Sequence, residues 1–168
     1  MQNKDYDISS NWIVINQMIT NQENASIGNL FLGNIWSAKS LEILNKYNIR
    51  TVLSICDFCD LNFDENNQIN HFIIEAKDEP NYDLKQDIDK CLDLIDTFLQ
   101  TSNILVHCQM GKSRSASIVI AYFMKKYQIN FDSAYQQVLK LKPDIKPNNG
   151  FILQLKKMNF YQIKNKKY

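Results

Sequence analysis

The chain has 168 residues, a formal net charge of +1, and 45% hydrophobic and 22% charged residues, which is the composition of an ordinary globular domain. This length predicts one domain with a sizeable core, and the near-neutral charge excludes a requirement for a polyanion, so no nucleic-acid partner is expected. No run of 18 apolar residues occurs, so no membrane span is expected.

Strands alternate with helices along most of the chain. Short apolar runs bounded by turn residues predict strands, and apolar residues three and four positions apart predict helices. We expect strands at 30–33, 51–55, 71–74 and 104–106, and helices at 37–47 (capped by Ser37), 84–99 and 118–127. A further helix, capped by Asn130 or Asp132, runs to about residue 141, and a last one starts at 148. An apolar patch at 12–15 predicts an extra strand or a short helix. The pattern therefore predicts a single α/β domain with a mostly parallel central sheet flanked by helices on both faces.

Four cysteines without an export signal predict reduced thiols. We therefore expect a cytoplasmic protein that can also occur in the nucleus. Cys56 and Cys59 form a single Cys-x-x-Cys pair, and one pair without a second does not predict a zinc site. The sequence does not predict an oligomeric state.

The strongest functional signal is the run His-Cys-Gln-Met-Gly-Lys-Ser-Arg-Ser-Ala-Ser at residues 107–117. It joins an expected strand to an expected helix, so it lies where parallel sheets bind ligands. Gly111 permits a tight turn, and Arg114 offers a two-pronged donor that fits phosphate oxygens. The same positive field would stabilise a thiolate on Cys108 and make it a nucleophile. The backbone N–H groups that can converge on a bound phosphate are those of Gln109, Met110, Gly111, Lys112, Ser113 and Arg114.

At this loop the chain resembles the cysteine-dependent protein phosphatases, whose signature is His-Cys, five residues, then Arg and Ser or Thr. The resemblance to their dual-specificity members runs from about residue 27 to residue 160, and small atypical members match best. Lys142 departs from the Arg that is usual in the family. The motifs that carry the resemblance are 29–34 (Asn-Leu-Phe-Leu-Gly-Asn), 121–122 (Ala-Tyr), 134–135 (Ala-Tyr), 142–143 (Lys-Pro), 147–151 (Pro-Asn-Asn-Gly-Phe) and 154–155 (Gln-Leu).

The resemblance implies a domain organisation. Residues 27–163 would form a dual-specificity phosphatase catalytic domain whose phosphate-binding loop lies at the C-terminal end of a strand. Residues 1–26 would be an N-terminal extension to which the sequence assigns no role, and residues 164–168 a basic tail.

The resemblance also implies roles for individual residues. Cys108 would attack phosphorus, Arg114 would bind the phosphate, and Ser115 would help the sulfur leave. His107 would hydrogen-bond the backbone near the nucleophile, and Ser113 would shape the loop. The expected reaction uses no metal and no cofactor.

Asp78 is the predicted general acid and base. It lies 30 residues before Cys108, at the family's acid position, in a run that contains Pro80 and is therefore expected to be a loop. A general acid is needed most when the leaving group is a serine alkoxide. Glu75 and Glu79 are the competing carboxylates.

Two further residues have more open interpretations. Lys112 either favours highly charged substrates or points to solvent. Cys56 ends an expected strand, and residues 55–57 resemble the place where lipid phosphatases related to tensin, and the phosphatases of regenerating liver, carry a second cysteine. A Cys56–Cys108 disulfide that protects the nucleophile from overoxidation is therefore a hypothesis.

The favoured interpretation is a phosphatase that hydrolyses phosphotyrosine, phosphoserine and phosphothreonine in protein substrates. A phosphoinositide phosphatase or an RNA 5′-phosphatase that uses the same loop is one alternative. A phosphate-binding pseudophosphatase is the other, although such domains typically lose the nucleophile.

Overall fold

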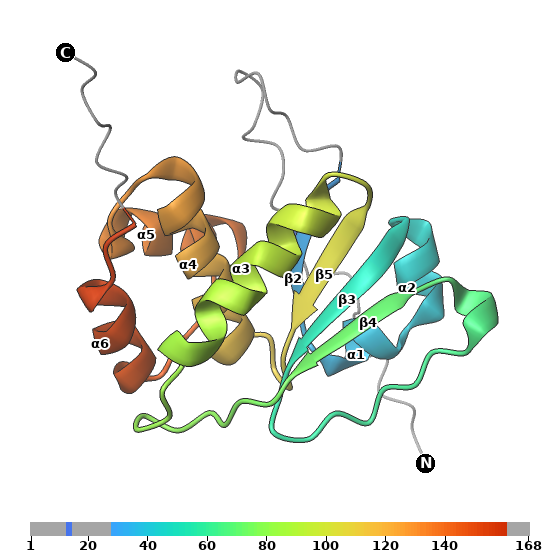
Figure 1. The fold of residues 1–168 in the computed structure, drawn as a ribbon, viewed down its shortest axis with the longest axis horizontal. Coiled ribbons are helices and arrows are strands. Elements are labelled where there is room, and N and C mark those ends of the chain that lie inside the picture. The colour runs from blue at the N-terminus through green and yellow to red at the C-terminus, as the bar shows by residue number, and fades with distance from the viewer. Residues whose placement is uncertain (1–12, 15–27, 161–168) are drawn as a thin grey trace.

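The computed structural model describes residues 13–14 and 28–160 of the chain (Figure 1). Its strands and helices alternate along most of that length. The strands are β1 (Ile13–Val14), β2 (Leu30–Gly33), β3 (Ile49–Ile55), β4 (Asn70–Ile74) and β5 (Asn103–His107), and the helices are α1 (Ile35–Lys39), α2 (Leu41–Lys46), the 3-10 helix η2 (Glu65–Asn67), α3 (Lys85–Leu99), α4 (Arg114–Tyr127), α5 (Phe131–Leu141) and α6 (Asn149–Lys157).

The five strands form one sheet in the order β1-β2-β5-β3-β4. Strands β2, β5, β3 and β4 pair in parallel, and β1 pairs antiparallel with β2 at one edge. The prediction of a mostly parallel sheet is confirmed. Of the two alternatives for the apolar patch at 12–15, Ile13–Val14 form a strand.

Helices cover both faces of the sheet, as predicted (Figure 1). Helices α3 and α4 contact one face, and α5 and α6 pack against α4. Helices α1 and α2 cover the other face. Alternation along β5 divides its side chains between two cores, because successive strand residues point to opposite faces. Ile104 and Val106 join the core beneath α3 and α4, whereas Leu105 joins the core beneath α1 and α2.

The single helix expected at 37–47 is wrong: the structure has two short helices with a break at Ser40. Ser37 does not cap a helix. The side chain of Asn34 accepts the Ser37 N–H at the start of α1, and the side chain of Ser40 accepts the Ile43 N–H at the start of α2. Ser40 has extended backbone torsions, which interrupt the helical path. Helical periodicity could not reveal this break because the apolar residues on both sides keep the same spacing.

Helix α4 begins at Arg114, four residues earlier than the apolar run from residue 118 predicts. Its first turn contains Arg114, Ser115, Ala116 and Ser117, which are all buried. Ser115 and Ser117 hydrogen-bond to the loop that follows β5, and Ala116 belongs to the core. Polar residues buried in this way give no hydrophobic signal. Every helix within the described residues is too short or too polar to cross a bilayer.

Candidate active site

Six residues, 108–113, connect β5 to α4 and form a tight loop at the C-terminal end of the sheet. Gly111 has φ +69, and a Cβ at this position would lie 2.5 Å from the carbonyl oxygen of Gly33. A side chain is therefore excluded both by the backbone conformation and by the neighbouring strand end. The Ile35 N–H also donates to the Gln109 carbonyl at 3.2 Å, so the loop is fixed against the start of α1.

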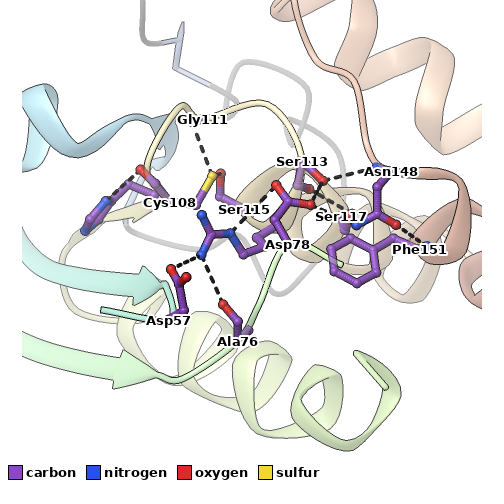
Figure 2. Close-up of polar contacts among 12 residues, drawn as sticks. Asp57, Ala76, Asp78, Cys108, Gly111, Ser113, Ser115, Ser117, Asn148 and Phe151 are labelled. Atoms are coloured by element: carbon purple, nitrogen blue, oxygen red, sulfur yellow. Dashed lines mark hydrogen bonds and ion pairs between the residues drawn. The ribbon is translucent and has the colours of Figure 1, made fainter. Parts of the chain in front are cut away.

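The sulfur of Cys108 accepts two hydrogen bonds, one from this loop and one from the first turn of α4 (Figure 2). The Gly111 N–H lies 3.2 Å from Sγ, and the Ser115 hydroxyl donates to Sγ from 3.1 Å. Cys108 is buried, and the N-terminus of the 14-residue helix α4 lies beside it, where the helix dipole favours negative charge. Two donors and a positive dipole end stabilise a thiolate over a neutral thiol.

Arg114 is held through one guanidinium nitrogen, Nη1, whereas a second nitrogen, Nε, has no hydrogen-bond partner among the described residues. Its Nη1 donates to Asp57 Oδ1 at 2.8 Å and to the Ala76 carbonyl at 3.0 Å (Figure 2). The hydrogen bond from Arg114 holds the pKa of Asp57 below its usual value. Buried Arg114 Nε has no hydrogen-bond partner in the described part of the chain, and Asp78 Oδ2 lies 3.8 Å from it. A buried cationic donor without a hydrogen-bond partner is suited to receive an anion.

Asp78 lies beside Arg114, in the segment between β4 and α3, as Figure 2 shows. Its Oδ1 accepts the Ser113 hydroxyl at 2.6 Å and the Asn148 Nδ2–H at 2.8 Å. The Asn148 backbone N–H donates to the same Ser113 hydroxyl at 3.1 Å. The structure thus brings Asp78 to the loop. Asp78 and the competing carboxylates Glu75 and Glu79 are all exposed, so the contacts with Ser113 and Asn148 are what distinguish Asp78.

The segment that carries Asp78 is held at both ends as well. The Tyr82 hydroxyl donates to the Glu75 carbonyl at 2.7 Å, which closes the segment on itself. A Cβ on Gly150, in the first turn of α6, would lie 1.8 Å from the Pro80 carbonyl oxygen. The backbones of α6 and of this segment are therefore in direct contact, and only glycine permits the approach.

His107, at the end of β5, is fully buried. Its Nδ1 lies 3.2 Å from the Cys108 carbonyl oxygen, and its Nε2 lies 2.6 Å from the hydroxyl of Ser54 on β3. Burial lowers the pKa of His107 to about 4, so the ring is neutral at pH 7. A neutral ring cannot serve as a cation here, and its contact with the loop is the one to the Cys108 carbonyl.

The structure also places Lys112 and Cys56. The ammonium of Lys112 lies 3.5 Å from Asp144 Oδ2, and buried Lys142 contacts the same carboxylate through Oδ1. Cys56 and Cys108 are both free thiols. Burial, reinforced by neighbouring Cys59, raises the pKa of the Cys56 thiol to about 12.

Sequence reasoning missed two residues that position this site, Asp57 and Asn148. Asp57 lies two residues after the end of β3, at the same edge of the sheet as the loop, and this position was the signal that could have identified it. Asn148 was recognised as part of a family motif and as the start of the last helix, where its side chain does cap α6, but not as a partner of Asp78. Its contact with Asp78 spans 70 residues of sequence, and no local pattern indicates it.

Among the described residues, no group of three or more His, Cys, Asp or Glu side chains is arranged to hold a metal ion.

Comparison with known proteins gives a consistent result. Residues 30–160 match the family model described as "Dual specificity phosphatase, catalytic domain". The chain is 38% identical over 130 residues to dual specificity protein phosphatase MPK-4 of Drosophila melanogaster, covering 76% of this chain and 33% of the relative. It is 35% identical over 127 residues to dual specificity protein phosphatase 1 of Arabidopsis thaliana, covering 75% and 63%. The chain therefore spans about one third to two thirds of the length of these relatives.

Solved structures share the fold. The human tyrosine phosphatase-like serine/threonine/tyrosine-interacting protein aligns with a TM-score of 0.70 and 31% identity, covering 75% of this chain and 87% of that one. DUSP15 aligns with a TM-score of 0.72 and 29% identity, covering 79% and 84%.

Proposed function

Since the chain belongs to the family of dual specificity phosphatase catalytic domains, we propose that it is a metal-independent protein phosphatase acting through a phosphocysteine intermediate. The observation that carries the proposal is the arrangement around one sulfur. Cys108 Sγ accepts hydrogen bonds from Gly111 and Ser115. Within the described residues, the buried Nε of neighbouring Arg114 has no hydrogen-bond partner and lies 3.8 Å from Asp78 Oδ2. This combination supplies a nucleophile and a phosphate ligand in one loop.

In the first step, the Cys108 thiolate attacks phosphorus and the bond between phosphorus and the ester oxygen breaks. Arg114 Nε and the loop N–H groups bind the equatorial oxygens, on which charge gathers in the transition state. Asp78, in its protonated form, gives its proton to the departing oxygen. The product alcohol or phenol leaves, and the phosphoryl group stays on sulfur.

In the second step, water attacks the phosphocysteine while Asp78, now a carboxylate, takes a proton from that water. The bond between phosphorus and sulfur breaks, and the electron pair returns to the thiolate. Ser115, whose hydroxyl donates to Sγ from 3.1 Å, stabilises the sulfur as it regains negative charge. Phosphate then leaves and the enzyme returns to its initial state.

We propose phosphotyrosine, phosphoserine and phosphothreonine in proteins as the substrates, as the family resemblance implies. Lys112 is the only loop feature that favours a more highly charged substrate such as a phosphoinositide, and its ammonium is engaged by Asp144 at 3.5 Å. A phosphatase-like interacting protein is among the similar solved structures, so a binding module is the second candidate.

Phosphate release from a panel of phosphopeptides and one soluble phosphoinositide, measured in EDTA, tests the proposal. We expect turnover of the phosphopeptides that EDTA does not change and that Cys108→Ser abolishes. If reduced wild-type protein binds the phosphopeptides but hydrolyses none of them, the binding module is correct and the proposal is wrong.

The role of Asp78 is tested by leaving-group dependence, with Glu79→Gln as the matched control on the same segment. Asp78→Asn should slow hydrolysis of an alkyl phosphate about 100-fold or more, the typical contribution of a general acid. It should slow hydrolysis of para-nitrophenyl phosphate far less, because para-nitrophenolate leaves without a proton. Equal losses on both substrates would assign the acid to another group.

A further inference from the structure

We propose that His71 is a positioning residue for the nucleophile and acts on the Cys108 peptide through Ser54 and His107. The inference rests on the proposed function, because it concerns how the thiolate of that mechanism is held. Three side chains from three neighbouring strands form the connection. His71 is on β4, Ser54 is on β3 and His107 is on β5.

The contacts form one continuous chain of hydrogen bonds. His71 Nε2 lies 2.8 Å from Ser54 Oγ, and the same Oγ lies 2.6 Å from His107 Nε2. At the other side of the ring, His107 Nδ1 lies 3.2 Å from the Cys108 carbonyl oxygen. Strand register explains the placement, since Ser54 pairs directly with His107, and His71 pairs with Val52, two residues before Ser54 on the same face of the sheet.

The direction of each hydrogen bond follows from the number of protons available. A carbonyl oxygen only accepts, so His107 Nδ1 must carry a proton. The ring is neutral because its pKa is about 4, so Nε2 has no proton and must accept the Ser54 hydroxyl proton. Ser54 then has no proton left for His71. His71 Nε2 must therefore be the donor to Ser54.

This direction gives His71 a function at a distance. Because His71 donates to the Ser54 oxygen, the Ser54 O–H is directed at His107 Nε2. This hydrogen bond favours the His107 tautomer that carries its proton on Nδ1. The His107 Nδ1–H in turn holds the Cys108 carbonyl. In a planar trans peptide the N–H points opposite to the C=O. The bond thus orients the Gln109 N–H, one of the amides expected to bind phosphate.

The three residues differ in their access to solvent. Ser54 and His107 are both 0% exposed, whereas His71 is half-buried on β4, the edge strand opposite β1. The His71 ring is packed edge-on against Phe63, with ring centroids 5.2 Å apart. Cys59 Sγ lies 3.9 Å from the same Nε2 and can only be a weak second acceptor. The ring is thus fixed by packing while its one donor is directed at Ser54.

Two substitutions separate the donor from the packing. His71→Gln places an amide N–H near the position of Nε2 but loses the ring. His71→Phe keeps a ring against Phe63 but loses the donor. If the donor matters, Phe is the harmful change and Gln the tolerated one; if only packing matters, the order is reversed.

The measurement is the rate of alkylation of Cys108 by iodoacetamide between pH 4 and pH 9, followed by mass spectrometry of the peptide that contains Cys108. We expect His71→Phe to slow alkylation at pH 6 about fivefold, the effect of one lost hydrogen bond, and to move the pH midpoint of the reaction upward. We expect His71→Gln to stay within about twofold of wild type, with kcat for phosphopeptides following the same order and KM unchanged. A wild-type rate in His71→Phe, or an equal loss in both variants, would overturn the inference.

A double-mutant cycle with Ser54→Ala checks the route. If His71 acts through Ser54, adding His71→Phe to Ser54→Ala should produce no further loss in the alkylation rate. Additive losses would overturn it. Alkylation requires no phosphate turnover, so an inactive wild-type protein would refute the proposed function while the order of the variants still tests the role of His71.

Discussion

Because His107 is buried in a neutral form, the stability of the fold should depend on pH in a defined window. The pKa of His107 is 6.5 in an unfolded chain and about 4 in the folded protein. Between these values the unfolded chain binds more protons, so the free energy of unfolding rises with pH through the window. The stabilisation is complete above about pH 6.5 and is lost as the pH falls to 4. At about 1.4 kcal/mol for each pH unit, the loss is about 3 kcal/mol.

Urea denaturation followed by circular dichroism at pH values between 4 and 7 measures this loss. The matched variant is His107→Asn, whose amide can donate to the Cys108 carbonyl but does not titrate. We expect the wild type to lose about 3 kcal/mol more than the variant between pH 7 and pH 4. Burial also lowers the pKa of His71, and that residue titrates in both proteins. Parallel pH dependences in the two proteins would refute the reasoning.

Three further predictions concern residues around the loop. Asp57→Ala removes the carboxylate that holds Arg114 at 2.8 Å, so KM for a phosphopeptide should rise. We expect a rise of about fivefold, which is modest because Asp57 is exposed to solvent. An unchanged KM, or an equal rise in the surface control Asp60→Ala, would contradict this. Ser115→Ala should slow hydrolysis of the phosphocysteine. Rapid-quench kinetics with para-nitrophenyl phosphate should then show a burst of one para-nitrophenolate per enzyme before slow turnover. The absence of a burst would rule out a role of Ser115 in this step. If Cys56 protects the nucleophile, the phosphatase activity of peroxide-treated wild type should recover fully in dithiothreitol, whereas that of Cys56→Ser should not. The control is Cys91→Ser, which removes another buried thiol. Equal recovery in all three proteins would reject the disulfide.

The sequence predicted those parts of the site that are local in the chain. The loop after β5 was recognised because Cys108, Gly111 and Arg114 lie within seven residues and follow an apolar strand. The parallel sheet followed from the alternation of apolar runs. These features depend on spacing and residue type, which a single sequence contains.

The parts that could not be predicted depend on contacts between distant segments. The contact between Arg114 and Asp57 spans 57 residues, and the contact between Ser54 and His107 spans 53. Ser54 and His71 gave no signal because a polar residue on an expected strand is ordinary. The break at Ser40 was missed for a different reason: a serine can continue a helix or cap one, and tertiary packing decides between the two.

The contacts that hold the segment carrying Asp78 bear on the thermodynamics of substrate binding. This segment is already fastened to the body of the protein by Asn148, by Tyr82 and by the close approach of Gly150 to Pro80. Fixing a flexible backbone costs about 1–2 kcal/mol of conformational entropy for each residue. Here that cost is met when the chain folds, so it does not weaken the affinity for a phosphorylated ligand. Association should therefore be a one-step process whose rate is set by encounter and charge, without a slow closing phase of this segment after the ligand has bound.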